Sequence, residues 1–177
     1  MDRRTYLRTA ATGAVGLAGA TAGCIGGGGE VVVNVQRTVT VQPGASWHTE
    51  IPDVSGEGGA ISYVAKADAP FDVYFFLSED QYDRYRAYLH GETDGGSLPA
   101  GDQEIGRTAT QAGQHTYRAS TDDDGARQPI DAAGPYYFVV DHSDYPPAGG
   151  AFPRDPPERR RVSVSLTVTK QQFSLPF

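Results

Sequence analysis

The alternation of apolar and polar residues along the chain predicts a protein built mainly from β-strands. The strongest pattern is the segment 71–77, FDVYFFL, in which successive side chains of an extended strand point to opposite faces. Apolar residues dominate both faces, which is typical of a strand in the interior of a sheet. Pro70 precedes the segment and disfavours a helix at this point. We therefore expect this strand to lie at the centre of the fold.

The residues after this strand predict a short helix over 79–90. Ser78 and Gln81 have the spacing of a capping box, in which the serine side chain accepts a hydrogen bond from the Gln81 amide. Acidic residues occupy the first turn, where the helix dipole favours negative charge, and Gly91 is a natural left-handed terminator. One face of the helix is expected to lie against the sheet and carries Tyr82, Tyr85 and Leu89.

The rest of the chain carries shorter alternating segments separated by turns rich in glycine and proline. Strands are expected over residues 31–41, 46–51, 60–67, 104–110, 114–119, 136–140 and 161–169. In the last of these, valine and leucine alternate with serine and threonine, which indicates a strand with one solvated face. We predict an all-β fold, an antiparallel β-sandwich of about seven to nine strands with one short helix, formed by a single domain over residues 30–177.

The first 24 residues carry a targeting signal rather than part of this fold. The segment RRTYLR, which begins with Arg3 and Arg4, resembles the twin-arginine export motif. The weakly apolar stretch that follows is too short to span a membrane, and it ends in TAGC, which resembles a lipobox. The resemblance implies that residues 1–23 are removed and that Cys24 is lipid-modified and becomes the new N-terminus. Residues 24–29 would then form a glycine-rich tether to an outward-facing domain on the cell membrane.

One residue of this signal departs from the lipobox pattern. Thr21 stands where an aliphatic residue is usual. Two alternatives therefore stay open, an ordinary export signal cut nearby and an uncleaved N-terminal anchor.

The charge of the chain narrows the range of partners. Removing residues 1–23 takes three arginines and one aspartate from the 15 basic and 22 acidic residues, which leaves 12 basic residues, 21 acidic residues and a net charge of −9. Only two of the basic residues are lysines. Nucleic acid and anionic membrane surfaces would be repelled, so neither is expected as a partner. The acidic, lysine-poor composition resembles that of secreted proteins of extreme halophiles, and a moderately acidic mesophile protein is the alternative.

Two sequence segments carry a resemblance at the level of the fold. FDVYFFLSEDQYDRY, followed later by PYYFVVDHS, resembles exported archaeal lipoproteins of uncharacterised function and, more loosely, the Golgi-dynamics (GOLD) β-sandwich. The resemblance covers about half of the mature chain, and its motifs are structural. It implies a β-sandwich with an accessory or binding role, and no catalytic residue is carried over.

Metal chemistry has one candidate in the sequence. The four histidines are scattered singly, and the single cysteine, Cys24, is the expected lipid anchor, so neither a zinc pattern nor a blue-copper ligand set is present. The segment 120–131 has the oxygen-ligand spacing of a calcium loop, with candidate ligands Ser120, Asp122, Asp124 and Asp131. Serine at position 1 and the short Asp131 at position 12 depart from that motif. A solvated acidic turn is therefore the alternative.

No sequence motif for catalysis or cofactor binding is found. There is no Gly-x-Ser-x-Gly elbow and no phosphate-binding glycine loop, and the consecutive residues Asp141, His142 and Ser143 cannot converge as a triad. No catalytic residue and no cofactor are therefore expected. An enzyme is the weakest of the three function classes that stay open.

The other two classes are binding functions. A cell-surface binding or accessory module is the main hypothesis, with an unknown protein or glycan as its partner. The candidate partner face is formed by Arg84 and Tyr88 at the margin of the helix, next to the polar loop 91–101, which is expected to be mobile. A small-ligand or glycan binder is the alternative, with four tyrosines as candidate stacking platforms, Tyr82, Tyr85, Tyr88 and Tyr145.

Overall fold

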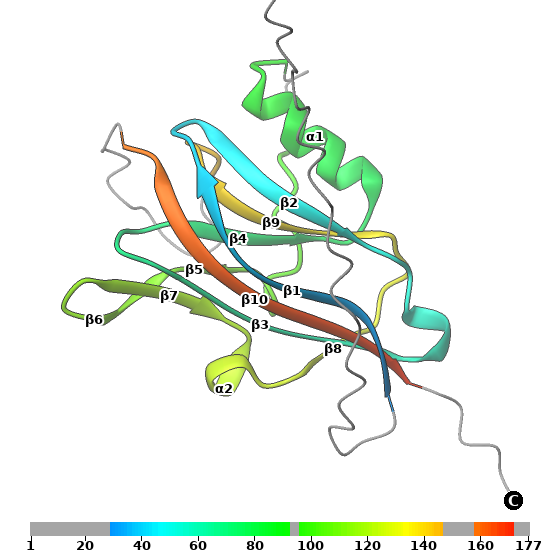
Figure 1. Cartoon of the computed structure of the whole chain (residues 1–177). Helices are drawn as coiled ribbons and strands as arrows, with labels where there is room; N and C mark the ends of the chain where they lie inside the picture. The colour runs from blue at the N-terminus through cyan, green and yellow to red at the C-terminus, as the bar shows by residue number, and fades with distance from the viewer. Residues whose placement is uncertain (1–28, 93–95, 147–157, 172–177) are drawn as a thin grey trace, which may run out of the picture.

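The protein folds into two antiparallel sheets packed face to face, with one helix on the outside (Figure 1). The computed structural model of the chain describes residues 29–92, 96–146 and 158–171. These residues form an all-β sandwich with a short helix, which confirms the predicted fold class. Within them, no helix is long and apolar enough to cross a membrane.

The larger sheet has six strands, and its main path runs in the order β1-β10-β3-β7-β6, with β8 paired to the remaining length of β3. All of its neighbouring strands are antiparallel. The strands are β1 (Gly29–Val41), β3 (Gly59–Ala67), β6 (Thr110–Gly113), β7 (Thr116–Ser120), β8 (Gln128–Ile130) and β10 (Arg160–Gln171).

The smaller sheet has four strands in the order β2-β9-β4-β5, again antiparallel throughout. The strands are β2 (Ala45–Ile51), β4 (Asp72–Phe76), β5 (Arg107–Thr108) and β9 (Tyr136–His142). The strand predicted at the centre of the fold is β4, which lies between β9 and β5, so its interior position is confirmed. All five of its residues are buried, because the two faces of this sheet pack against different layers.

Two local differences from the sequence prediction have clear causes. The described residues contain ten strands rather than seven to nine, because β5 and β8 are pairings of only two and three residues that carry little periodicity. The strands predicted over 104–110 and 114–119 place their turn between residues 110 and 114, but the observed hairpin turns at Gln114 and His115, because Gly113 still pairs with Thr116 across a bulge in β6.

The helix α1 (Glu79–Leu89) begins and ends at the predicted signals. Ser78 Oγ accepts a hydrogen bond from the Gln81 amide at 3.3 Å. Gln81 Oε1 accepts from the amide of Leu77 at 3.2 Å, one residue earlier than a capping box requires. His90 caps the C-terminus, and Gly91 adopts φ 71°, the left-handed conformation that glycine takes without steric cost.

The remaining elements are two single turns. A 3₁₀ turn, η1 (Ser55–Glu57), precedes β3, and α2 (Asp122–Gly125) follows β7. Asp123 and Asp124 in α2 have positive φ angles of 47° and 62°, so this segment is a tight acidic turn rather than a regular helix. The sequence prediction of a single regular helix therefore agrees with the described residues.

The protein has two apolar layers rather than one. The inter-sheet core lies between the sheets and contains Ile61, Val164 and Leu166 from the larger sheet and Val73, Phe75 and Phe138 from the smaller one. The second, which we term the aromatic layer, lies between the smaller sheet and α1 and consists of Tyr74, Phe76, Tyr82, Tyr85, Tyr137, Val139 and Tyr145. The smaller sheet is therefore the middle layer of a three-layer arrangement.

Candidate functional site

The aromatic layer holds α1 firmly on the outer face of the smaller sheet. Tyr82 of the helix stacks on Tyr137 of β9 with ring centroids 4.3 Å apart and an interplanar angle of 5°. Tyr85, one turn further along the helix, packs 5.0 Å from Phe76 of β4 and edge-on to Tyr145 at 4.8 Å. Aromatic pairs of this kind stabilise beyond the area they bury, so the helix has one well-defined position on the sheet.

A polar row crosses the smaller sheet at the edge of this layer. Asp141 of β9 lies opposite Asp72 of β4, Ser46 of β2 lies opposite Asp141, and Thr108 of β5 lies opposite Asp72. Directly opposed residues of an antiparallel pair share one face and have Cβ atoms about 5 Å apart. The two carboxylates are therefore neighbours, and both are buried, with exposures of 7% for Asp72 and 1% for Asp141.

Each carboxylate of this row accepts hydrogen bonds from the fold itself. Thr108 Oγ1 donates to Asp72 Oδ1 at 2.5 Å. Asp141 accepts from Tyr85 Oη at 2.5 Å, from the Ser143 amide at 3.1 Å and from Ser143 Oγ. Burial raises the pKa of Tyr85, and the nearby Asp141 charge raises it further, so its phenol stays protonated and keeps donating.

This row anchors the helix to the sheet. Tyr85 is fully buried, and its hydroxyl reaches across the aromatic layer to a carboxylate of β9, which fixes the rotation of α1. Sequence reasoning missed the row, although the signal was present. Asp72 interrupts an apolar strand between Phe71 and Val73, and Asp141 ends another.

The predicted partner face, Arg84 and Tyr88, lies at the margin of α1, and we refer to this pair as the helix margin. Arg84 pairs with Asp80 one turn earlier at 3.2 Å and donates to the Ser97 carbonyl at 3.4 Å, while its side chain stays 46% exposed. Tyr88 is half-buried, packs edge-on to Tyr145 at 5.1 Å and donates to the Asp144 carbonyl at 3.1 Å. Both side chains are therefore held in place. The neighbouring loop 91–101 is described except for residues 93–95.

The proposed tyrosine stacking platforms are corrected by the structure. Tyr82, Tyr85 and Tyr145 have exposures of 6%, 0% and 1% and form the interior of the aromatic layer. Their faces are covered by one another, so they cannot stack on a glycan at the surface. Tyr88 alone of the four keeps a partly exposed side chain.

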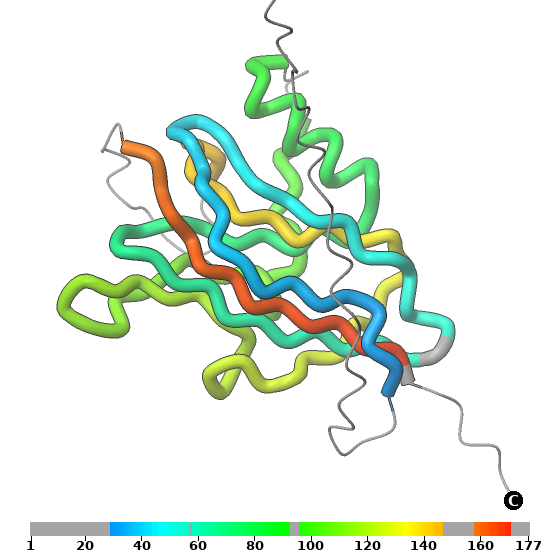
Figure 2. Tube along the Cα trace, viewed as in Figure 1, coloured from blue at the N-terminus to red at the C-terminus, as the bar shows by residue number. Residues whose placement is uncertain are grey.

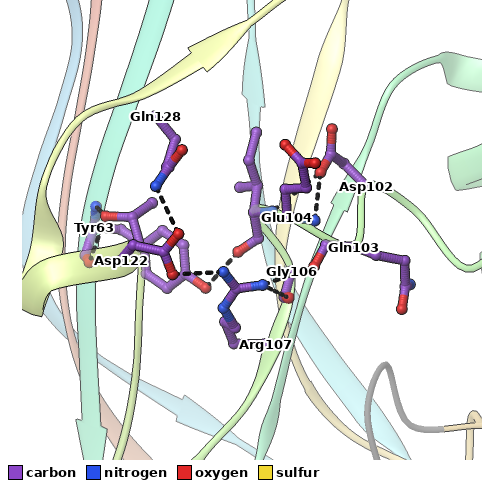
Figure 3. A network of polar contacts seen from close by, with 10 residues as sticks. Tyr63, Asp102, Gln103, Glu104, Gly106, Arg107, Asp122 and Gln128 are labelled. Carbon is purple, nitrogen blue, oxygen red and sulfur yellow. Dashed lines mark hydrogen bonds and ion pairs between the residues drawn. The ribbon is translucent and has the colours of Figure 1, made fainter.

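The four candidate calcium ligands do not converge on one point. Asp122 accepts from Arg107 at 2.8 Å and from Gln128 at 2.9 Å, as Figure 3 shows, and Asp124 pairs with Arg118 at 2.7 Å. These arginines already balance the two carboxylates. The acidic turn therefore ties the β7 end of the larger sheet to β5 of the smaller one.

The strand register separates the remaining ligands. Ser120 pairs with Val64 of β3, whereas Asp131 follows Ile130, which pairs with Gly59 of the same strand. Five residues of strand separate these positions by ~16 Å. The calcium hypothesis is therefore corrected, because the pairing of β7 and β8 with β3 draws the two ends of the loop apart. In the described residues no group of three or more His, Cys, Asp and Glu side chains could hold a metal ion.

The histidines do not form a common site in the described part of the chain. His48 packs against the Tyr82 ring at 4.9 Å, and burial lowers its pKa, with a smaller contribution from Arg86. His142 lies within hydrogen-bonding distance of the Glu158 carbonyl, with Nε2 at 3.0 Å from the oxygen. Asp141 and His142 point to opposite faces of β9, and Ser143, which follows the strand, donates a hydrogen bond to Asp141 and not to His142, so the three side chains do not converge.

The export and lipidation residues Arg3, Arg4 and Cys24 lie outside the described residues. Comparison with known proteins adds no functional assignment. No protein-family model matches the chain, and no curated protein matches it.

Proposed function

We propose that this protein is an exported β-sandwich, held on the outer face of the cell membrane by a lipid on Cys24, that binds a protein partner through the helix margin. In this proposal it acts as a binding or accessory module. No cofactor enters the proposal.

The position of the helix relative to the tether supports this arrangement. The first strand begins at Gly29, the last residue of the glycine-rich segment that follows Cys24. In Figure 2 the blue start of β1 lies beside the red end of β10 at one side of the sandwich, and the green helix lies at the opposite side. A domain tethered at the start of β1 would therefore present α1 away from the membrane.

The observation that carries the proposal is that the side chains of Arg84 and Tyr88 are held in place by hydrogen bonds while remaining partly exposed. Arginine and tyrosine are the residue types that most often dominate binding energy in interfaces. At the helix margin both are pre-positioned by hydrogen bonds to Ser97 and Asp144, and the Arg84 side chain remains 46% exposed. Ordering such side chains before binding lowers the entropy cost of forming a complex.

The anchor is tested on the native membrane fraction. Mass spectrometry should find a mature N-terminus at Cys24 that carries lipid, and Cys24→Ser should release the protein from the membrane. A soluble mature protein that begins at another residue would contradict the anchor but would leave the helix margin untouched.

The binding face is tested by site-specific photo-crosslinking in intact cells. A photoreactive residue at Ala87, which lies on α1 between Arg84 and Tyr88, should give a discrete adduct, and Arg84→Glu in the same chain should abolish it. The matched control is Arg127→Glu, which makes the same charge change at an exposed position beyond β7. An adduct that survives Arg84→Glu, or is lost equally in the control, would refute the helix margin as the binding face.

A further inference from the structure

One arginine of the sandwich is buried where the strand pattern calls for an apolar residue. Arg160 is the first residue of β10, and it shares its parity with Val162 and Val164, which face the inter-sheet core. Its exposure is 5%, whereas the adjacent Arg159 and Arg161 are exposed. The three arginines are consecutive, so their different environments are set by the alternation of the strand.

The charge of Arg160 is not balanced by any described residue. No ion pair or hydrogen bond joins its guanidinium group to residues 29–92, 96–146 or 158–171, and its Nε is shielded from solvent without a partner. By contrast, the arginines that form ion pairs in the described residues keep partly exposed side chains, including Arg107 and Arg118. A buried cation costs free energy unless an anion or several hydrogen-bond acceptors compensate it.

Arg160 lies at one end of the sandwich, at the first residue of β10, and we term the surroundings of its side chain the sandwich mouth. Arg160 lies opposite Val41 at the end of β1, and His142 lies opposite Ala45 at the start of β2. The turn 42–44 joins β1 to β2 here, and the amide of Gly44 donates to the His142 carbonyl at 2.8 Å. His142 shares the inward parity of Val140, so the guanidinium and the imidazole face the same space from the two sheets.

The electrostatics of His142 agree with this placement. Burial lowers the pKa of His142, the Glu158 carbonyl raises it, and the positive charge of Arg160 lowers it further. The imidazole is therefore mostly neutral at pH 7. The sandwich mouth then holds one positive charge, which matches a single negative charge rather than a dianion.

We infer that the sandwich mouth is an anion site in which Arg160 binds one carboxylate group. A planar guanidinium presents parallel N–H donors that match the two oxygens of a carboxylate, and the pairing neutralises the buried charge. The carboxylate belongs to a small organic acid or to the acidic end of a peptide. The inference does not depend on the lipid anchor or on the helix margin.

The test measures the thermal stability of the purified full chain in sodium acetate, with ionic strength held constant by sodium chloride. A ligand that binds only the folded state at ten times its Kd raises the folded-to-unfolded ratio about 11-fold. We expect a saturable rise in Tm with acetate that Arg160→Met abolishes and the matched control Arg161→Met retains. A short peptide with a free C-terminal carboxylate, compared with its amidated form, distinguishes a peptide from a small acid as the source.

A second readout does not depend on a shift in Tm. Titration of the His142 imidazole by NMR should show its pKa rising when acetate is added, because the bound anion offsets the charge of Arg160. Arg160→Lys keeps the charge but loses the paired donors, so it should bind acetate more weakly and lose the preference over chloride. An equal effect of chloride in the wild-type chain would overturn the carboxylate assignment. An acetate effect that persists in Arg160→Met, or no acetate effect on either readout, would overturn the site.

Discussion

Raising the pH from 9 to 11 should destabilise this fold by about 4 kcal/mol through three buried tyrosines alone. Tyr63, Tyr85 and Tyr145 have exposures of 0%, 0% and 1%. Burial raises the pKa of each phenol above the ordinary value of 10.0. The folded state therefore keeps three protons that the unfolded chain releases above pH 10. The stability they provide is fully present below pH 10 and is lost as the pH rises towards the folded pKa values.

The magnitude follows from proton linkage. An unfolded tyrosine with a pKa of 10 gains about 1.4 kcal/mol from ionisation between pH 9 and pH 11, and the folded phenols gain almost nothing in that range. Three such groups give about 4 kcal/mol, a large part of the 5–15 kcal/mol that stabilises a typical domain. Between pH 7 and pH 9 neither state ionises these phenols, so the same comparison should show little change from them.

The assay is urea unfolding followed by the fluorescence of Trp47 and by circular dichroism at pH 7, 9 and 11. Tyr63→Phe removes one phenol, together with its 2.7 Å hydrogen bond to the Ile105 carbonyl. The lost hydrogen bond lowers stability equally at every pH. The difference between pH 9 and pH 11 should therefore shrink by about 1.4 kcal/mol in this variant. A wild-type difference below about 1 kcal/mol, or one that Tyr63→Phe leaves unchanged, would refute the reasoning.

Three further predictions concern packing, backbone and salt. Phe75→Ala and Tyr82→Ala should each lower the free energy of unfolding, measured in urea, by about 2–4 kcal/mol through lost core packing. Tyr88→Ala should lower it by only about 1–2 kcal/mol, because this variant loses one hydrogen bond and part of its packing. Equal losses in the three variants would place Tyr88 in the core. Gly101→Ala should lower the free energy of unfolding by about 1–3 kcal/mol in the same assay, because Gly101 has φ 70° and a Cβ there would lie 2.8 Å from the Phe75 carbonyl oxygen. An unchanged free energy of unfolding would mean that the loop relaxes to accept the side chain. The Tm should rise between dilute buffer and molar KCl, because the segment 24–177 has 21 acidic and 12 basic residues and salt screens the repulsion of the excess negative charge. A Tm that does not change with KCl would argue against the halophile interpretation.

The sequence alone determined the features that depend on neighbours a few residues apart. Alternation over 71–77 and 161–169 identified the interior strand β4 and the half-solvated strand β10, because side-chain direction in a strand follows from parity. Ser78 and Gly91 marked the ends of α1, because capping groups act within one turn. The helical period placed Tyr82 and Tyr85 on one face of α1, and this predicted that both side chains are buried against the sheet.

The candidate sites were decided by pairing between strands that are far apart in the chain. Asp72 and Asp141 become neighbours only through the register of β4 and β9, and nothing local to either residue specifies the other. The register of β7 and β8 on β3 likewise separates Ser120 from Asp131, which local spacing had grouped as one loop.

Arg160 shows the same limit at a single position. The alternation of β10 was visible from residue 161 onward, and a charged residue before it gave no local reason to extend the strand. Pairing with Val41 of β1 adds that residue to the strand. Side chains alternate between the two faces of a strand, so Arg160 points to the same face as Val162 and its charge lies between the two sheets.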